Sequence, residues 1–122
     1  MFEVQFYENE NGQRPVEEFV SNLDEKMQAK FVGLLEVLEE KGPTLREPYS
    51  KHLKDGIFEI RCQVGNNLSR VLYFFYYGKK IILTNGFVKK TQKTPASELR
   101  LAKKRRSEYL ERMRKDENIK RI

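Results

Sequence analysis

The 122-residue sequence contains one cysteine, one histidine and no tryptophan. A single thiol, Cys62, excludes an internal disulfide and suits a reducing compartment, so we expect a cytoplasmic protein in which Cys62 is a buried structural residue. One cysteine and one histidine also provide too few ligands for a structural zinc site. The sequence therefore predicts no metal centre.

Long hydrophobic runs are also absent. The longest apolar run, residues 71–77, is far too short to cross a membrane. The N-terminus alternates apolar and polar residues and lacks the basic region and apolar stretch of a signal peptide. Hydrophobic residues still make up 39% of the chain, which is enough for the core of a single domain spanning 1–122.

A net positive charge is absent from residues 1–88 and is confined to the end of the chain. Residues 1–88 carry 11 Lys/Arg and 13 Asp/Glu, whereas residues 89–122 carry 13 Lys/Arg and 5 Asp/Glu. The basic segment would attract a polyanion such as nucleic acid, although a solvated charged helix would have the same composition. The candidate nucleic-acid contacts there are Arg100, Lys103, Lys104, Arg105 and Arg106.

Hydrophobic periodicity predicts one strand and two helices in the first third of the chain. Residues 2–6 alternate as in a short strand. Apolar residues at helical spacing predict one helix that begins near Pro15 and a second that follows Asp24 and ends at Lys41. The next segment, residues 44–55, is expected to be a loop.

The sequence after residue 55 predicts three strands and a basic helix. The strands are expected over 57–64, 70–77 and 80–89, joined by a four-residue loop and a tight Gly78-Lys79 turn. The helix is expected over 95–115 with Thr94 as its cap, and residues 116–122 are expected to fray. The fold class is α+β in the order β-α-α-β-β-β-α, with a twisted, mostly antiparallel sheet and the two N-terminal helices on one of its faces.

The strand register brings several polar side chains to one face. If the loop pairs Val64 with Ser69 and the turn pairs Tyr77 with Lys80, alternation places on one side the residues Glu59, Arg61, Arg70, Asn85, Phe87 and Lys89. One interpretation is a surface ion pair between Glu59 and an arginine. The other is a phosphate pocket, with bidentate arginines and with Phe87 either stacked on a base or part of the core.

The expected loop before these strands carries further candidates. His52 has a side chain that can act as an acid or base near neutral pH, although an ordinary surface histidine is the favoured interpretation because the chain has no second histidine as its partner. Tyr49 and Lys51 are candidate RNA contacts in the same loop.

Three segments resemble the phage-derived branch of the HigB/RelE toxin superfamily. They are residues 53–61, residues 69–74 and, most specifically, residues 85–95 (Asn-Gly-Phe-Val-Lys-Lys-Thr-Gln-Lys-Thr-Pro). The resemblance extends along essentially the whole chain. It implies a small RelE-like fold and a toxin of a type II toxin–antitoxin system. Such a toxin is a metal-independent, cofactor-free endoribonuclease that cleaves mRNA on the ribosome and thereby inhibits translation.

The resemblance also implies roles for individual residues. Arg61 and Arg70 would bind the phosphate and the transition state, and Glu59 would be the general base for the attacking 2′-hydroxyl, at a position where the RelE branch has lysine. Lys89, Lys90 or Lys93 would act as the general acid. The tyrosine that RelE-type members use after this segment has no clear counterpart here.

The implied partners are the ribosome, mRNA and a HigA-like helix-turn-helix antitoxin, with a toxin–antitoxin heterotetramer as one possible assembly. Two other functions stay open because fold alone does not decide function. One is a non-catalytic, ParE-like gyrase poison, and the other is a nucleic-acid-binding regulator.

Overall fold

The computed structural model describes residues 1–88 and 93–120, and within these residues it shows three α-helices and one five-stranded sheet. In chain order the elements are β1 (Glu3–Phe6), α1 (Pro15–Ser21), α2 (Glu25–Lys41), a short 3-10 helix (Gly42–Thr44), β2 (Ser50–Lys54), β3 (Ile57–Val64), β4 (Asn67–Tyr76), β5 (Lys80–Val88) and α3 (Ala96–Lys120). The predicted α+β class is confirmed, but the order differs because β2 was not predicted.

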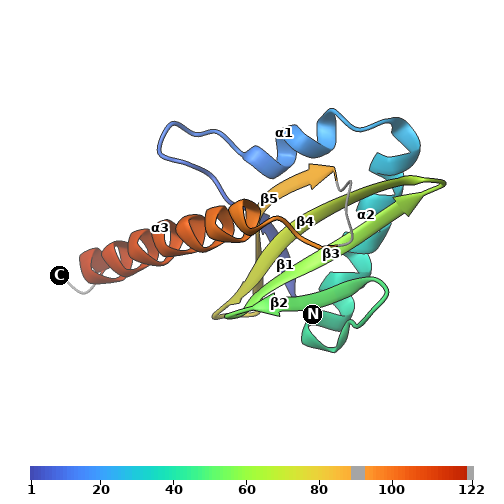
Figure 1. The fold of residues 1–122 in the computed structure, drawn as a ribbon. Helices are drawn as coiled ribbons and strands as arrows, with labels where there is room; N and C mark the ends of the chain where they lie inside the picture. The colour runs from blue at the N-terminus through green and yellow to red at the C-terminus, as the bar shows by residue number, and fades with distance from the viewer. Residues whose placement is uncertain (89–92, 121–122) are drawn as a thin grey trace.

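The sheet is mixed and mostly antiparallel (Figure 1). Its strand order is β1-β5-β4-β3-β2, in which β1 runs parallel to β5 and the other neighbours are antiparallel. The central strands β3, β4 and β5 therefore form a meander, and β1 and β2 are the two edges.

Residues 44–55, predicted as a loop, contain the edge strand β2. It pairs with β3 through an Asp55-Gly56 turn whose φ angles, 53° and 79°, are both left-handed. A two-residue Asp-Gly connection is typical of a tight β-hairpin. The strand was missed because an exposed edge strand with three basic residues lacks a continuous hydrophobic pattern.

The predicted register was wrong at both turns, yet the side chains share the predicted face. Val64 pairs with Asn67, not Ser69, so the pairing shifts by two residues and each side chain keeps its face. At the other turn Tyr76, not Tyr77, pairs with Lys80, and an irregularity after Leu72 cancels this shift of one residue. The predicted pairs Leu72–Asn85 and Arg70–Phe87 are consequently confirmed.

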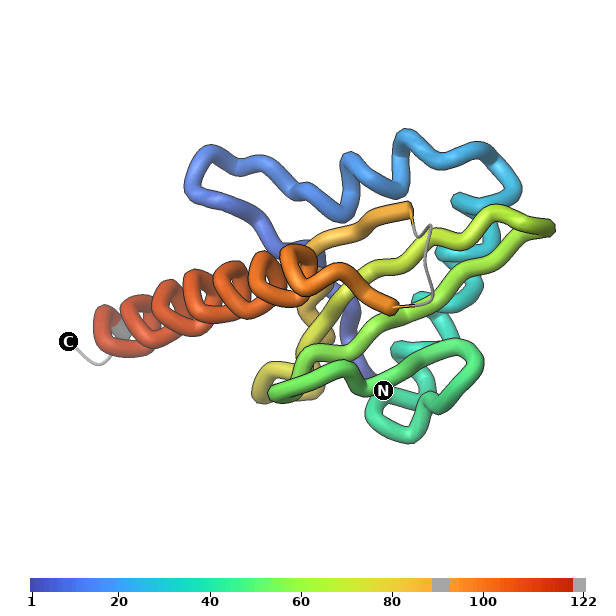
Figure 2. The backbone as a smooth tube through the Cα atoms, viewed as in Figure 1, coloured from blue at the N-terminus to red at the C-terminus, as the bar shows by residue number. Residues whose placement is uncertain are grey.

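The sheet separates two hydrophobic layers (Figures 1 and 2). As predicted, α1 and α2 cover one face, where Phe31 and Leu38 pack against Ile60 and Val71. On the opposite face, Leu72, Phe74 and Phe87 of the sheet form a layer with Ala102 and Tyr109 of α3. This second layer covers only part of its face, so the polar set on β3 and β4 lies beside the first turns of α3.

The C-terminal part of α3 projects away from the sheet (Figure 1). The helix continues to Lys120, past its predicted end at Lys115, so residues 116–120 of the expected frayed tail are helical. Leu110 is 41% exposed although it is hydrophobic, because it lies on the outer side of this helix. No helix in the described part of the chain is both long and hydrophobic enough to span a bilayer.

The contact between Tyr7, which directly follows β1, and α3 predicts a pH-dependent stability. The buried Tyr7 hydroxyl donates to the Glu108 carboxylate, and the Arg105 guanidinium lies 5.5 Å from the centre of the Tyr7 ring. Burial, together with the Glu108 hydrogen bond, raises the pKa of Tyr7 from 10.0 to about 12.

Because the folded state holds this proton more tightly, the stabilisation is complete below pH 10 and is lost as the pH rises toward 12. We expect the free energy of unfolding to fall over this range in urea titrations. Tyr7→Phe should show a smaller decrease, and identical slopes for the two proteins would contradict the assignment.

Candidate active site

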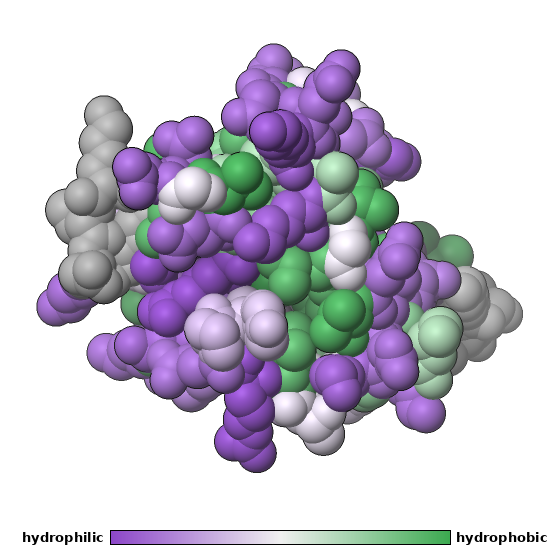
Figure 3. All heavy atoms as spheres, turned by 90° about the vertical axis from the view of Figure 1, so that its right-hand side faces the viewer, coloured by the Kyte–Doolittle hydropathy of each residue, from purple (hydrophilic) through white to green (hydrophobic). Residues whose placement is uncertain are grey.

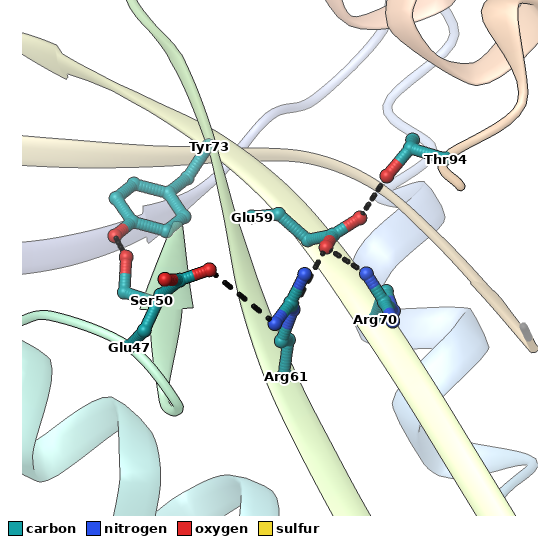
Figure 4. Close-up of polar contacts among 7 residues, drawn as sticks. All are labelled: Glu47, Ser50, Glu59, Arg61, Arg70, Tyr73 and Thr94. Atoms are coloured by element: carbon teal, nitrogen blue, oxygen red, sulfur yellow. Dashed lines mark hydrogen bonds and ion pairs between the residues drawn. The ribbon is translucent and has the colours of Figure 1, made fainter. Parts of the chain in front are cut away.

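Glu59 is a fully buried carboxylate at the centre of the polar cluster on β3 and β4 (Figure 4). Its Oε1 accepts hydrogen bonds from Arg70 Nη1 and, at 3.3 Å, from Arg61 Nε. Its Oε2 accepts a hydrogen bond of 2.5 Å from the Thr94 hydroxyl, which precedes α3. Both carboxylate oxygens are therefore occupied, as a buried charge requires.

The two arginines have different environments. Arg61 and Arg70 are directly opposite partners in the β3–β4 pair. The Arg70 side chain is 4% exposed, and burial lowers the pKa of its guanidinium, an effect that the Glu59 carboxylate opposes. Among the described residues, its buried Nε has no hydrogen-bond partner.

Arg61 is the more accessible cation of the pair. Its side chain is 23% exposed, and it makes a second, longer ion pair of 3.7 Å with the exposed Glu47. One buried carboxylate thus anchors two guanidinium groups, and the second carboxylate, Glu47, is exposed and more distant. Together with the lysines that line the smaller pocket beside Arg61, the two arginines make the cluster suited to binding an anion.

Two pockets flank Arg61. The larger, about 430 Å³, is lined by Arg61, Arg70 and a group of apolar and polar side chains from α2, the loop before β2 and the β3–β4 hairpin. The smaller, about 280 Å³, is lined by Arg61 together with Lys51, Lys54, Lys93, Thr94 and two leucines. Lys30 is a third cation in the lining of the larger pocket, so both pockets combine cations with apolar side chains, and Arg61 lines both of them.

Of the predicted site residues, the structure brings Lys51 and Lys93 to the smaller pocket beside Arg61. Lys54, Thr94 and Glu47 also surround the cluster but were not predicted as site residues. Lys54 was missed together with strand β2, and Thr94 was predicted only as a helix cap. Nothing in the local sequence pattern indicates the Glu47 contact.

Other predicted residues lie elsewhere. His52 is on the opposite face of the sheet, where its ring packs against Phe58 at 4.9 Å and its Nε2 accepts a hydrogen bond from the Gly56 amide. Phe87 is 9% exposed within the α3 layer, so it is a core residue rather than a free stacking surface. Lys89 and Lys90 lie outside the described residues.

Asn85 shares the face of the cluster but is directed toward α3. Its side-chain amide donates to the backbone oxygen and the carboxylate of Glu98. Asn85 therefore fixes the first turns of α3 over the sheet, next to the Thr94 hydroxyl that reaches Glu59.

Most of the basic candidates on α3 hold the helix against the β2–β3 turn and strand β5. Lys103 and Arg106 donate to the carboxylate and the backbone oxygen of Asp55, and the Lys103 hydrogen bond lowers the pKa of Asp55. Arg105 donates to the Thr84 carbonyl at 2.9 Å. Lys104 and Arg100 are exposed and remain candidates for contacts with a polyanion.

The remaining candidates concern thiol and metal chemistry. Cys62 is buried, as predicted, and burial raises the pKa of its thiol. Within residues 1–88 and 93–120, no group of three or more His, Cys, Asp or Glu side chains is arranged to hold a metal ion.

Comparison with known proteins identifies a family for most of the chain. The model of the family described as "Phage derived protein Gp49-like (DUF891)" matches residues 18–107, a range that contains α2, all of β2–β5 and the polar cluster. No curated protein matches the sequence. This phage-derived family is associated with the toxins of toxin–antitoxin systems. The chain belongs to the Gp49-like family of phage-derived proteins.

Proposed function

We propose that this protein is the toxin of a type II toxin–antitoxin system and that it cleaves mRNA on the ribosome without a metal ion. The observation that carries the proposal is the convergence of the Arg61 and Arg70 guanidinium groups on the buried Glu59 carboxylate. Two anchored guanidinium groups at the floor of a pocket are a suitable receptor for one phosphodiester. Family membership supports the toxin assignment.

In the proposed reaction, the ribose 2′-hydroxyl attacks the adjacent phosphorus and the 5′-oxygen of the next nucleotide leaves. The products are a 2′,3′-cyclic phosphate and a free 5′-hydroxyl. Arg61 and Arg70 stabilise the charge that develops on the phosphoryl oxygens, and this stabilisation is the largest contribution expected from the protein. Lys51 and Lys54 guide the RNA backbone into the smaller pocket.

Glu59 has a different role in this proposal from the one expected from the sequence. Its carboxylate is fully buried and both of its oxygens already accept hydrogen bonds, so it has no free position from which to take the 2′-hydroxyl proton. We therefore assign Glu59 as a positioning residue for the two arginines. The 2′-hydroxyl proton is then lost to solvent water as the cyclic phosphate forms, and the leaving 5′-oxygen takes a proton from a lysine of the β5–α3 segment, Lys93 at the pocket or the preceding Lys89 and Lys90.

The proposed partners follow from the same function. The ribosome presents the mRNA, and a HigA-like helix-turn-helix antitoxin, alone or in a heterotetramer, neutralises the toxin in the cytoplasm. The exposed Lys104 is assigned to ribosomal RNA backbone. Lys103, Arg105 and Arg106 are already tied to the body, so they are assigned to holding α3 in place.

The experiment is controlled expression of the chain in a bacterial host, with sequencing of RNA ends and an assay for double-strand breaks in DNA. We expect growth arrest with new mRNA ends inside translated regions and with intact DNA. Growth arrest with DNA breaks and intact mRNA would instead identify a gyrase poison. Sequence-specific DNA binding without either effect would identify a regulator.

A further inference from the structure

The larger pocket beside Arg61 has a different set of lining residues from the smaller pocket. Its lining combines three cations and a glutamine with four apolar or aromatic side chains, namely Lys30, Arg61, Arg70 and Gln63 with Leu34, Pro48, Tyr49 and Leu68. Its volume of about 430 Å³ lies within the range of small-molecule sites, roughly 300–1,000 Å³. Figure 3 views the side where the β3–β4 hairpin loop and the α2–β2 connection lie in Figure 1, and it shows hydrophobic surface enclosed by hydrophilic residues.

Tyr49 is the aromatic side chain of this pocket, and it is 51% exposed. Its backbone is fixed at both polar groups, because its amide donates to the Arg46 carbonyl at 3.1 Å and its carbonyl accepts from the Arg61 amide at 2.9 Å. The ring is therefore attached to a rigid position next to Arg61. A half-exposed aromatic ring on a fixed backbone offers a flat surface at low entropic cost.

The position of Arg61 connects the two pockets chemically. Arg61 lines both pockets, so a nucleotide whose phosphate binds Arg61 would have its neighbouring groups at these pockets. Nucleobases have flat, largely apolar faces and are linked to phosphate through the ribose, so a base suits the aromatic and apolar part of the larger pocket beside an anchored phosphate. An acidic amino-acid side chain would also bring an anion, but it has no flat ring that could stack on Tyr49.

We propose that this pocket is a nucleobase subsite, in which Tyr49 stacks on the base of a nucleotide adjoining the phosphate held by Arg61. The inference rests on the proposed ribonuclease function and names the part of the substrate that the site recognises beyond the backbone. Stacking accepts any base, so the subsite positions the RNA with little sequence preference.

The test is fluorescence anisotropy with a labelled, fully 2′-O-methylated ten-nucleotide RNA, which cannot be cleaved by 2′-hydroxyl attack. Tyr49→Ala should weaken binding by about 5- to 100-fold, the range expected for one base–aromatic stack, whereas Tyr49→Phe should bind as the parent protein does. Tyr77→Ala is the matched control because Tyr77 is 86% exposed and does not line the pocket. Equal thermal unfolding of all variants shows that folding is unchanged.

Abasic nucleotides placed one at a time along the RNA identify the stacked base. At one position, the abasic RNA should weaken binding to the parent protein as much as Tyr49→Ala does, and the two changes together should cause no further loss. Additive losses, no loss with Tyr49→Ala, or no saturable binding by the parent protein would overturn the nucleobase subsite.

The outcomes separate the two proposals. The expected abasic pattern with no cleavage of unmodified mRNA on ribosomes would overturn the nuclease and leave the subsite standing. Cleavage of mRNA without the abasic pattern would overturn the subsite alone.

Discussion

Replacing Arg61 with alanine should lower the rate of mRNA cleavage by about a hundredfold or more, the usual cost of removing one donor that stabilises transition-state charge. Arg61 is the accessible guanidinium of the cluster, and both pockets open onto it. The fold should survive, because Glu59 keeps its contacts with Arg70 and Thr94. The measurement is the single-turnover cleavage rate on programmed ribosomes, with the thermal unfolding midpoint as the check on folding.

Two further variants test whether the effect is specific to the Arg61 guanidinium. Arg61→Lys keeps the charge but loses the planar pair of donors, so we expect intermediate activity. Lys104→Ala removes an exposed charge from α3 and should leave the single-turnover rate at saturating ribosomes unchanged. A cleavage rate for Arg61→Ala within a factor of three of the parent protein would remove Arg61 from the reaction.

Replacing Glu59 with alanine should destabilise the protein by about 3–5 kcal/mol, the range for breaking a buried ion pair from one side. The change leaves the buried Arg70 cation directly opposite Arg61 without the carboxylate that both share. It also removes the acceptor of the Thr94 hydroxyl, which helps to hold the start of α3. The measurement is the free energy of unfolding from urea titration.

The matched control is Glu47→Ala. Glu47 also contacts Arg61, but it is exposed and its ion pair is 3.7 Å long, so its loss should cost at most about 1 kcal/mol. Similar losses for Glu47→Ala and Glu59→Ala would mean that the cluster is an ordinary surface network. Glu59→Gln keeps the shape of the side chain, and it should retain more stability than Glu59→Ala while still lowering cleavage.

The sequence could predict that Arg61 and Arg70 share a face, because side-chain alternation tolerates pairing errors of two residues. The β3–β4 loop is shorter than expected, but Arg61 and Arg70 still share a face. The second turn was wrong by one residue, an error that would have separated Asn85 and Phe87 from the arginines. The irregularity after Leu72 restores the predicted register of Asn85 and Phe87. No sequence pattern predicts where such an irregularity lies.

The sequence could not predict burial around the polar cluster, because burial depends on how distant elements meet. Glu59 is covered by the segment that precedes α3, through the Thr94 hydroxyl. Strand β2 brings Lys51 and Lys54 to the same site, and its polar edge pattern concealed it. The Thr94 contact, which occupies the second carboxylate oxygen, is one reason why we propose Glu59 as a positioning residue and not as the general base.

The basic residues on α3 show that a count of charges does not predict which side chains bind within the protein itself. Their composition would suit a nucleic-acid-binding helix, but Lys103 and Arg106 donate hydrogen bonds to Asp55, and Arg105 donates one to Thr84. Asp55 belongs to the β2–β3 turn, far from α3 in the sequence. Part of the positive charge of the last third therefore stabilises the docking of the helix.

The central claim is that two guanidinium groups held by one buried carboxylate bind a scissile phosphodiester of mRNA. It is tested most directly by incubating the purified protein with ribosomes programmed with a defined mRNA and analysing the cleaved ends. Our account predicts an upstream fragment ending in a 2′,3′-cyclic phosphate, and no cut where the scissile nucleotide carries 2′-deoxyribose. Intact mRNA, or equal cleavage of the 2′-deoxy substrate, would contradict it.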